Sequence, residues 1–197
     1  MSNPEMQPYS MKLGVYERFC ASREETLVLE ENALSPSAGT FDIAKSDGEI
    51  LFRVESRTAW PSGYRTRIID YRSNTLLFAI GRNIVGSGFY AKGPDDKTIL
   101  KIKDRSSETV CSFMSFLRRS EALINEPGRP HAREEIKDKT TGQIIALMSR
   151  SSLVGLVPDR IGRQTYTVTV AQGVDMALVV AMCFCLDDML FKATRTD

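Results

Sequence analysis

The chain has 197 residues, of which 42% are apolar and 26% are charged, and its formal net charge at pH 7 is +1. This composition is ordinary for a soluble globular protein of one domain with tails, and without an overall basic excess we expect no nucleic-acid partner. The first ten residues lack the basic and then apolar order of a secretion signal, so we expect a cytoplasmic protein.

The predicted domain runs from residue 19 to residue 190, between a flexible N-terminal tail (1–18) and a C-terminal tail (191–197). Within it, four stretches share one pattern, in which turn residues precede apolar residues and then an arginine at the same offset. They begin at Leu51, Leu76, Ile99 and Ile144. Strand signals that alternate with turn signals in this way predict an all-β meander of hairpins.

Further strands are predicted around these repeats from β-branched residues and from alternation at period two. In chain order the predicted strands are 26–29, 41–44, 51–57, 64–70, 76–82, 88–92, 99–105, 133–138, 144–150 and 164–170. Residues 107–124 stay ambiguous, because their apolar residues fit helical spacing while the string CSFMSF favours a strand. The string NEPGRPH, from Asn125 to His131, predicts a loop. About a dozen strands are expected in all.

The run Val174–Leu186 (VDMALVVAMCFCL) is apolar on every helical face and uncharged after Asp175. Such a helix must be buried all round, either in a bilayer or inside a protein. A bilayer requires about 20 apolar residues, and this run stops short at Asp187 and Asp188, which we expect to end the helix. The protein interior is therefore favoured, and no transmembrane span is expected.

The predicted fold is mainly β, a closed antiparallel β-barrel of about 12 strands around a central hydrophobic C-terminal α-helix. Closure removes the edges of a sheet of many short strands, and a single apolar helix fills the lumen. A helix ending at Asp188 is about 20 Å long, about the height of a small barrel. The helix is thus expected to be the core.

Three strings resemble the signature of the LURP-one-related family, whose members share the tubby C-terminal-like fold. The strings are YTVTVAQGVDMALVVAMCFCLDD (166–188), FCASREETLVLE (19–30) and KTTGQIIALMSR (139–150). The resemblance covers nearly the whole chain from Phe19 to Met189. It implies a twelve-stranded barrel threaded by a hydrophobic helix.

The resemblance implies a non-enzymatic module of unassigned role. Tubby proteins bind phosphoinositide headgroups with basic residues on the barrel wall, so anionic phospholipid headgroups at a membrane surface are the expected partners, with peripheral membrane association. Phospholipid scramblases use the same fold at membranes. The alternative hypothesis is therefore a scramblase-like protein whose helix 174–186 inserts into lipid.

Catalytic and metal-binding motifs are weak, so we expect no enzyme, no cofactor and no metal. The single histidine, His131, lies in the predicted loop and is expected to be solvated. Cys183 and Cys185, one residue apart on a helix, point to different faces and cannot form a redox pair. The string GRNIVGSG (81–88) lacks the lysine and the following helix of a phosphate-binding loop, and predicts a hairpin turn.

Positive charge concentrates in the middle of the chain, where residues 49–105 carry eleven basic and six acidic side chains, a balance of +5. In this segment Arg65 and Arg67 alternate along one predicted strand, and Lys101 and Lys103 along another. Each pair projects from one face with Cα atoms about 6.5 to 7 Å apart, a spacing that suits two phosphates of an inositol lipid. The competing interpretation is that these side chains only keep the strands soluble. The four residues are the predicted ligand-binding set.

Overall fold

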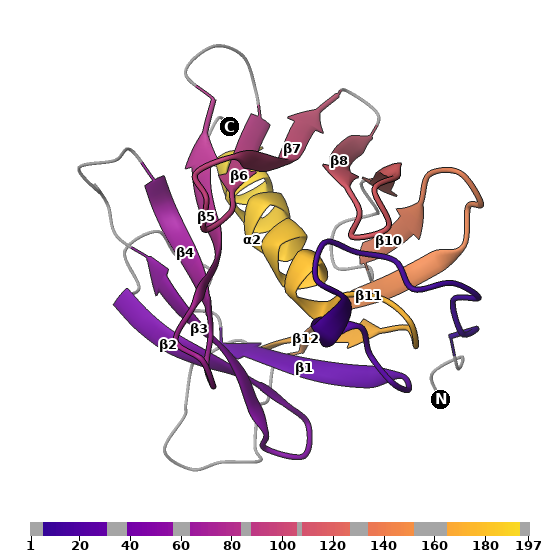
Figure 1. The fold of residues 1–197 in the computed structure, drawn as a ribbon, viewed down its shortest axis with the longest axis horizontal. Coiled ribbons are helices and arrows are strands. Elements are labelled where there is room, and N and C mark those ends of the chain that lie inside the picture. The colour runs from indigo at the N-terminus through magenta and orange to yellow at the C-terminus, as the bar shows by residue number, and fades with distance from the viewer. Residues whose placement is uncertain are drawn as a thin grey trace.

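The computed structural model describes residues 6–30, 39–56, 64–83, 88–105, 108–126, 134–151 and 165–193. These residues form a closed barrel of twelve antiparallel strands around one α-helix (Figure 1). The strands are β1 (Glu25–Glu30), β2 (Gly39–Lys45), β3 (Ile50–Ser56), β4 (Tyr64–Asp70), β5 (Leu76–Arg82), β6 (Gly88–Lys92), β7 (Thr98–Asp104), β8 (Thr109–Met114), β9 (Ser120–Asn125), β10 (Glu134–Asp138), β11 (Ile144–Ser151) and β12 (Thr165–Val170). The helices are the 3₁₀ turn η1 (Glu17–Phe19) and α2 (Met176–Ala193). The predicted fold class is confirmed.

Each strand pairs with the next one along the chain, and the β1–β12 pair closes the barrel. The closing pair is in register from Glu25 opposite Val170 to Glu30 opposite Thr165. Closure gives every strand a partner on each side, although β1 and β2 are in register only at Leu27–Lys45 and Val28–Ala44. We call the barrel end at which β12 leads into α2 the capped end. The turns after β2, β4, β6, β8 and β10 lie at the same end.

Alternation along the strands places apolar side chains toward the helix. On β3, Phe52 and Val54 are 0% exposed, while Arg53 between them is partly exposed. On β12, Val168 and Val170 are 0% exposed. These inward residues join the helix in one continuous buried cluster. The helix is therefore the centre of the core, as the sequence predicted.

Burial of α2 is complete from Met176 to Leu186, where every residue is at most 6% exposed. This confirms that an all-apolar helix needs an enclosing environment. The expected end at Asp187 and Asp188 is wrong, since the helical backbone continues to Ala193. Aspartate lowers helix stability by only about half a kcal/mol, and no glycine or proline follows to stop the helix.

Residues 6–21, which we call the N-terminal segment, cross the capped end of the barrel. Leu13, only 2% exposed, donates its N–H to the Gly173 carbonyl at 2.9 Å and accepts a hydrogen bond from the Asp175 N–H at 2.9 Å. Gly14 beside it has φ of +152°, and a Cβ atom there would lie 2.1 Å from the Asp175 Cβ. Tyr9 and Leu13 of this segment are thus hydrogen-bonded to the backbone between β12 and α2.

The side chain of Asp175 joins the N-terminal segment to the helix. Its Oδ1 accepts hydrogen bonds from the N–H groups of Ala177 (2.9 Å) and Leu178 (3.3 Å), in the manner of a helix cap. Its Oδ2 accepts from the N–H groups of Val15 (3.0 Å) and Tyr16 (2.8 Å). Burial raises the pKa of this carboxyl to about 6, although the four N–H donors favour the charged form and so lower the pKa.

The described part of the ambiguous stretch, residues 108–124, forms most of a hairpin, β8 and β9, rather than a helix. Its turn is held by the Ser115 N–H, which bonds the Arg119 carbonyl at 2.9 Å, and by the Arg118 N–H, which bonds the Ser115 carbonyl at 2.8 Å. On β8, Cys111 and Phe113 face the core and Ser112 faces outward. Barrel register thus overrides the helical spacing that the apolar residues also fit.

Candidate anion-binding site

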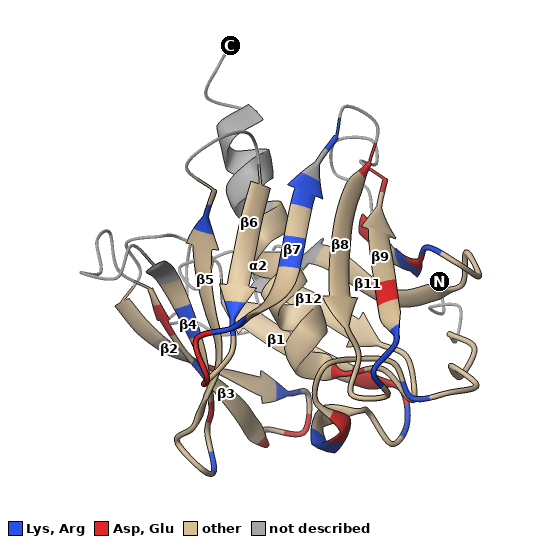
Figure 2. Ribbon diagram, turned by 45° about the horizontal axis from the view of Figure 1, so that its top comes forward, with Lys and Arg blue, Asp and Glu red and all other residues tan. Residues whose placement is uncertain are grey.

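Two lysines stand on the outer wall of the barrel because β7 alternates. Leu100 and Ile102 face the core and are only 1% and 3% exposed. The alternate residues of the strand, Lys101 and Lys103, therefore face solvent, and both are exposed. Their Cα atoms are about 6.5 to 7 Å apart, as expected for alternate residues of a strand. Figure 2 shows the blue of these lysines on β7.

The neighbouring strand β6 adds two more outward side chains, Tyr90 and Lys92. Tyr90 lies directly opposite Lys101 across the β6–β7 pair, and Lys92 lies opposite Thr98. This places an aromatic hydroxyl and three ammonium groups on adjacent strands. Strand register, rather than a loop, therefore fixes their spacing.

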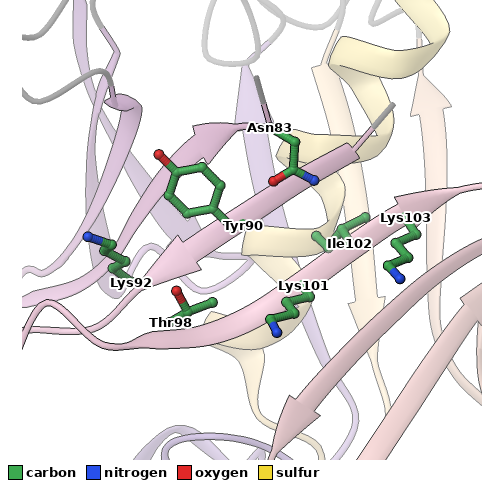
Figure 3. A pocket seen from close by; sticks show the side chains of 7 residues that line it. All are labelled: Asn83, Tyr90, Lys92, Thr98, Lys101, Ile102 and Lys103. Carbon is green, nitrogen blue, oxygen red and sulfur yellow. The ribbon is translucent and has the colours of Figure 1, made fainter. Parts of the chain in front are cut away.

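Together these side chains line an open groove of about 360 Å³ on the outer wall (Figure 3). Its lining residues are Asn83, Tyr90, Lys92, Thr98, Lys101, Ile102 and Lys103. We call this the lysine groove. Close approach of β6 to β7 at one end requires Gly88, which has φ of +149° and whose Cβ, if present, would lie 2.4 Å from the Ile102 carbonyl oxygen.

The lysine groove carries uncompensated positive charge. Lys92 is paired with Asp96, with its Nζ 3.0 Å from Oδ2, in the turn that joins β6 to β7. Lys101 and Lys103 form no ion pair with any residue whose side chain the structure describes. Because no carboxylate is among the described residues that line the groove, an anion entering it would meet two cations that have no described partner.

The predicted ligand-binding residues fall into two groups. Arg67 faces outward on β4, between the buried Thr66 and Ile68, and forms an ion pair with Glu55 on β3 at 3.5 Å. Arg65 precedes it by two residues, and its side chain lies outside the described residues. Strands β5 and β6 separate β4 from β7, a distance of about 14 Å at the usual strand spacing. The structure therefore joins Lys101 and Lys103 in one groove, while Arg67 lies outside it on β4.

The sequence reasoning missed Tyr90 and Lys92. Both lie on the predicted strand 88–92, and the short turn before the strand from 99 predicts a hairpin with it. Applying the alternation rule to this partner strand as well as to the lysine strand would have placed Tyr90, Lys92 and Lys101 on one face. The signal for these two residues is therefore present in the sequence of the partner strand.

The histidine and the cysteines were the other candidates for catalysis or metal binding. His131 lies outside the described residues. Cys183 and Cys185 are buried in α2, at 0% and 2% exposure. Burial raises the pKa of the Cys111 thiol, and burial together with Asp175 raises the pKa of Cys20 to about 12, so neither is a thiolate near neutral pH.

The described residues contain no group of histidine, cysteine, aspartate and glutamate side chains that could hold a metal ion. The helices among them include none that is long and apolar enough to cross a bilayer.

Comparison with known proteins agrees with the fold. The family model described as LURP-one-related matches residues 25–187, from the first strand of the barrel into its central helix. No curated protein and no solved structure matches this chain. The matched range contains all twelve strands and the buried part of α2. The chain belongs to the LURP-one-related family.

Proposed function

We propose that this protein is a non-catalytic binding module that recognises the phosphorylated headgroup of a phosphoinositide lipid in the lysine groove. The observation that carries the proposal is the pair Lys101 and Lys103, exposed on one strand and without a described counter-ion. Lysine is a compact charge that binds phosphate well, and its long stem lets two ammonium groups adjust to two phosphates.

The rest of the groove suits a polyhydroxylated, phosphorylated ring. The Tyr90 hydroxyl, the Asn83 amide and the Thr98 hydroxyl supply neutral hydrogen-bonding groups beside the ammonium groups. The described lining residues include no acid, histidine, serine or cysteine, and the cluster of ammonium groups among them suits electrostatic binding of an anion.

Binding from the outer wall is preferred to insertion of the helix. In a scramblase-like mechanism the side chains of 176–186, now at most 6% exposed, would have to leave the barrel and empty its core. A headgroup in the lysine groove requires no such change. The proposal therefore places the protein at the membrane surface, with the barrel intact.

Vesicle sedimentation tests the proposal. Wild-type protein is mixed at low salt with phosphatidylcholine vesicles that contain or lack a phosphatidylinositol bisphosphate, and soluble inositol trisphosphate is added as a competitor. We expect pelleting only with the phosphoinositide, and its loss on adding the competitor or salt. Inorganic phosphate at the same concentration distinguishes a headgroup site from a general phosphate site. Added phosphate should leave the pelleting unchanged if the groove is a headgroup site and reduce it if the groove binds any phosphate.

Charge reversal locates the site. The double variant Lys101→Glu, Lys103→Glu should bind the phosphoinositide vesicles at least about ten-fold more weakly, since each basic residue near an anionic surface contributes about 1 kcal/mol. The matched control is Arg23→Glu, Arg72→Glu, which changes the net charge equally at side chains that are 74% and 78% exposed and outside the groove. Equal loss in both variants, or no phosphoinositide dependence in the wild type, would refute the proposal.

A further inference from the structure

Exposed apolar side chains gather at one place on this barrel. Among the described residues, four large apolar side chains are exposed, and three of them are Met11 (53%), Met114 (56%) and Leu117 (46%). Met114 ends β8, and Leu117 lies in the turn after it. Met11 reaches the same turn, because its Sδ lies 3.9 Å from an Arg119 guanidinium nitrogen. We call these three residues the apolar tip.

The turn that carries Leu117 is held in place. Two backbone hydrogen bonds between Ser115 and the Arg118–Arg119 pair close it, and Arg118 adopts a left-handed φ of 58°. The Phe116 N–H also donates to the Gly14 carbonyl at 3.1 Å, which fixes the turn to the N-terminal segment. Turns usually carry glycine, proline, asparagine, aspartate or serine. Here a well-fixed turn instead presents leucine to water.

The apolar tip continues the surface that contains the lysine groove. Lys101 pairs with Ser112 on β8, and Met114 is the next outward residue on that strand, so Lys101 and Met114 are diagonal neighbours about 7–8 Å apart. The outward residues of β8 and β9 carry no charge, and β8 is tan along its length in Figure 2. They are Val110, Ser112, Met114, Ser120, Ala122 and Ile124. An uncharged strip thus links the groove to the tip.

We propose that the apolar tip inserts into the interfacial layer of an anionic membrane while the lysine groove holds a headgroup, a proposal that rests on the function proposed above. Arg118 and Arg119, both exposed, border the tip and complement anionic lipid, and their apolar stems suit the same layer. Three side chains form a patch well below the roughly 800 Å² per partner of a stable protein interface. For a few apolar residues bordered by two arginines, a lipid surface is the fitting occupant.

The test separates lipid insertion from headgroup recognition. In the double variant Leu117→Ser, Met114→Ser, affinity for soluble inositol trisphosphate, measured by calorimetry, should equal that of the wild type. Affinity for phosphoinositide vesicles should fall about ten-fold, because two half-exposed apolar side chains no longer leave water. The control Tyr71→Ser removes an apolar side chain that is 39% exposed and lies on the β4–β5 turn, and it should leave both affinities unchanged.

A second measurement reports insertion directly. In Leu117→Trp, phosphoinositide vesicles should shift the added tryptophan emission to shorter wavelength, and lipids brominated on their acyl chains should quench it. The spectrum of the wild type, which contains one tryptophan, is subtracted. An unshifted and unquenched signal in a variant that pellets normally would overturn the insertion.

The outcomes distinguish the two proposals. Normal vesicle binding by the double-serine variant overturns insertion and leaves headgroup recognition standing. Vesicle binding that depends on the tip, without any affinity for soluble inositol trisphosphate, supports insertion and overturns recognition in the groove. A wild-type dimer that becomes a monomer in the double-serine variant would assign the tip to a second copy of the chain and overturn insertion.

Discussion

Replacing Asp175 by asparagine tests how the barrel end is closed. The carboxylate is fully buried and accepts four backbone hydrogen bonds, two from the start of α2 and two from Val15 and Tyr16. Asparagine keeps one oxygen, which can continue to cap the N–H groups of Ala177 and Leu178. Its NH₂ group then faces the Val15 and Tyr16 N–H groups, so that donors oppose donors.

The expected cost follows from these two lost bonds. A buried donor left without an acceptor costs about 1–3 kcal/mol, and removal of a buried charge offsets part of the total. We therefore expect Asp175→Asn to lower the free energy of unfolding by about 2–4 kcal/mol, against a total of roughly 5–15 kcal/mol for a domain. Asp175→Ala, which leaves all four donors without an acceptor, should cost more.

Urea unfolding followed by far-UV circular dichroism measures the loss. Because burial raises the pKa of Asp175 to about 6, the comparison is made well above that pH, where the carboxylate is ionised. Amide hydrogen exchange should show faster exchange at Val15 and Tyr16 and little change at Ala177. The control Asp42→Asn, at a partly exposed acid paired with Arg53, should change stability by less than about 0.5 kcal/mol. An asparagine variant as stable as this control would refute the role assigned to Asp175.

Three further predictions concern the core and the N-terminal segment. Val180→Asp places a charge at the centre of α2, where the side chain is 0% exposed. It should lower the free energy of unfolding by well over about 4 kcal/mol and abolish soluble folding. A folded, protease-resistant variant would contradict the buried helix. Gly14→Ala should lower the free energy of unfolding, measured in urea, by about 2–4 kcal/mol, because the added Cβ would lie 2.1 Å from the Cβ of Asp175. The control Gly48→Ala, at a φ of +91° with no atom within 4 Å of the added Cβ, should lower it clearly less. Tyr9→Phe removes a 2.8 Å hydrogen bond to Asp138 and should cost about 1–2 kcal/mol at neutral pH. Burial raises the pKa of Asp138, but hydrogen bonds from neighbouring hydroxyl and backbone groups outweigh it, and the net pKa is lowered. The carboxylate therefore stabilises the fold above its unfolded pKa of about 4, and it loses this effect as the pH falls through its lower pKa in the folded state. The loss of stability caused by Tyr9→Phe should accordingly become smaller in acid. A loss of stability that does not depend on pH would contradict this.

Most of the barrel could be predicted from local patterns because its connections are simple. Each strand pairs with its sequence neighbour, so turns and alternation are sufficient to place strands such as 64–70 and 76–82. The exceptions have physical causes. Residues 107–124 satisfy both periodicities, and only pairing with β7 decides between them. The N-terminal segment has no period at all, since it bonds the irregular backbone between β12 and α2.

Only the two lysines of the candidate site could be predicted, because the rest of the groove depends on how neighbouring strands pair. Alternation identified Lys101 and Lys103 as outward residues from one strand alone. A groove, however, is made by two strands, and their register contains a shift between Ala91 and Lys92 that alternation along one strand does not reveal. The separation of Arg67 from the lysines depends on the strand order, and its pairing with Glu55 depends on the register of β3 with β4.

The central claim is that the lysine groove is the binding site, and backbone amide chemical shifts test it most directly in a chain of 22.0 kDa. Titration with soluble inositol trisphosphate should shift the amides of Tyr90, Lys92, Lys101 and Lys103 along β6 and β7. The amide of Arg67 on β4, three strands away, should stay unchanged. Saturable shifts confined to β6 and β7 are the predicted result. Shifts centred on β4, or no shifts at all, would contradict the claim.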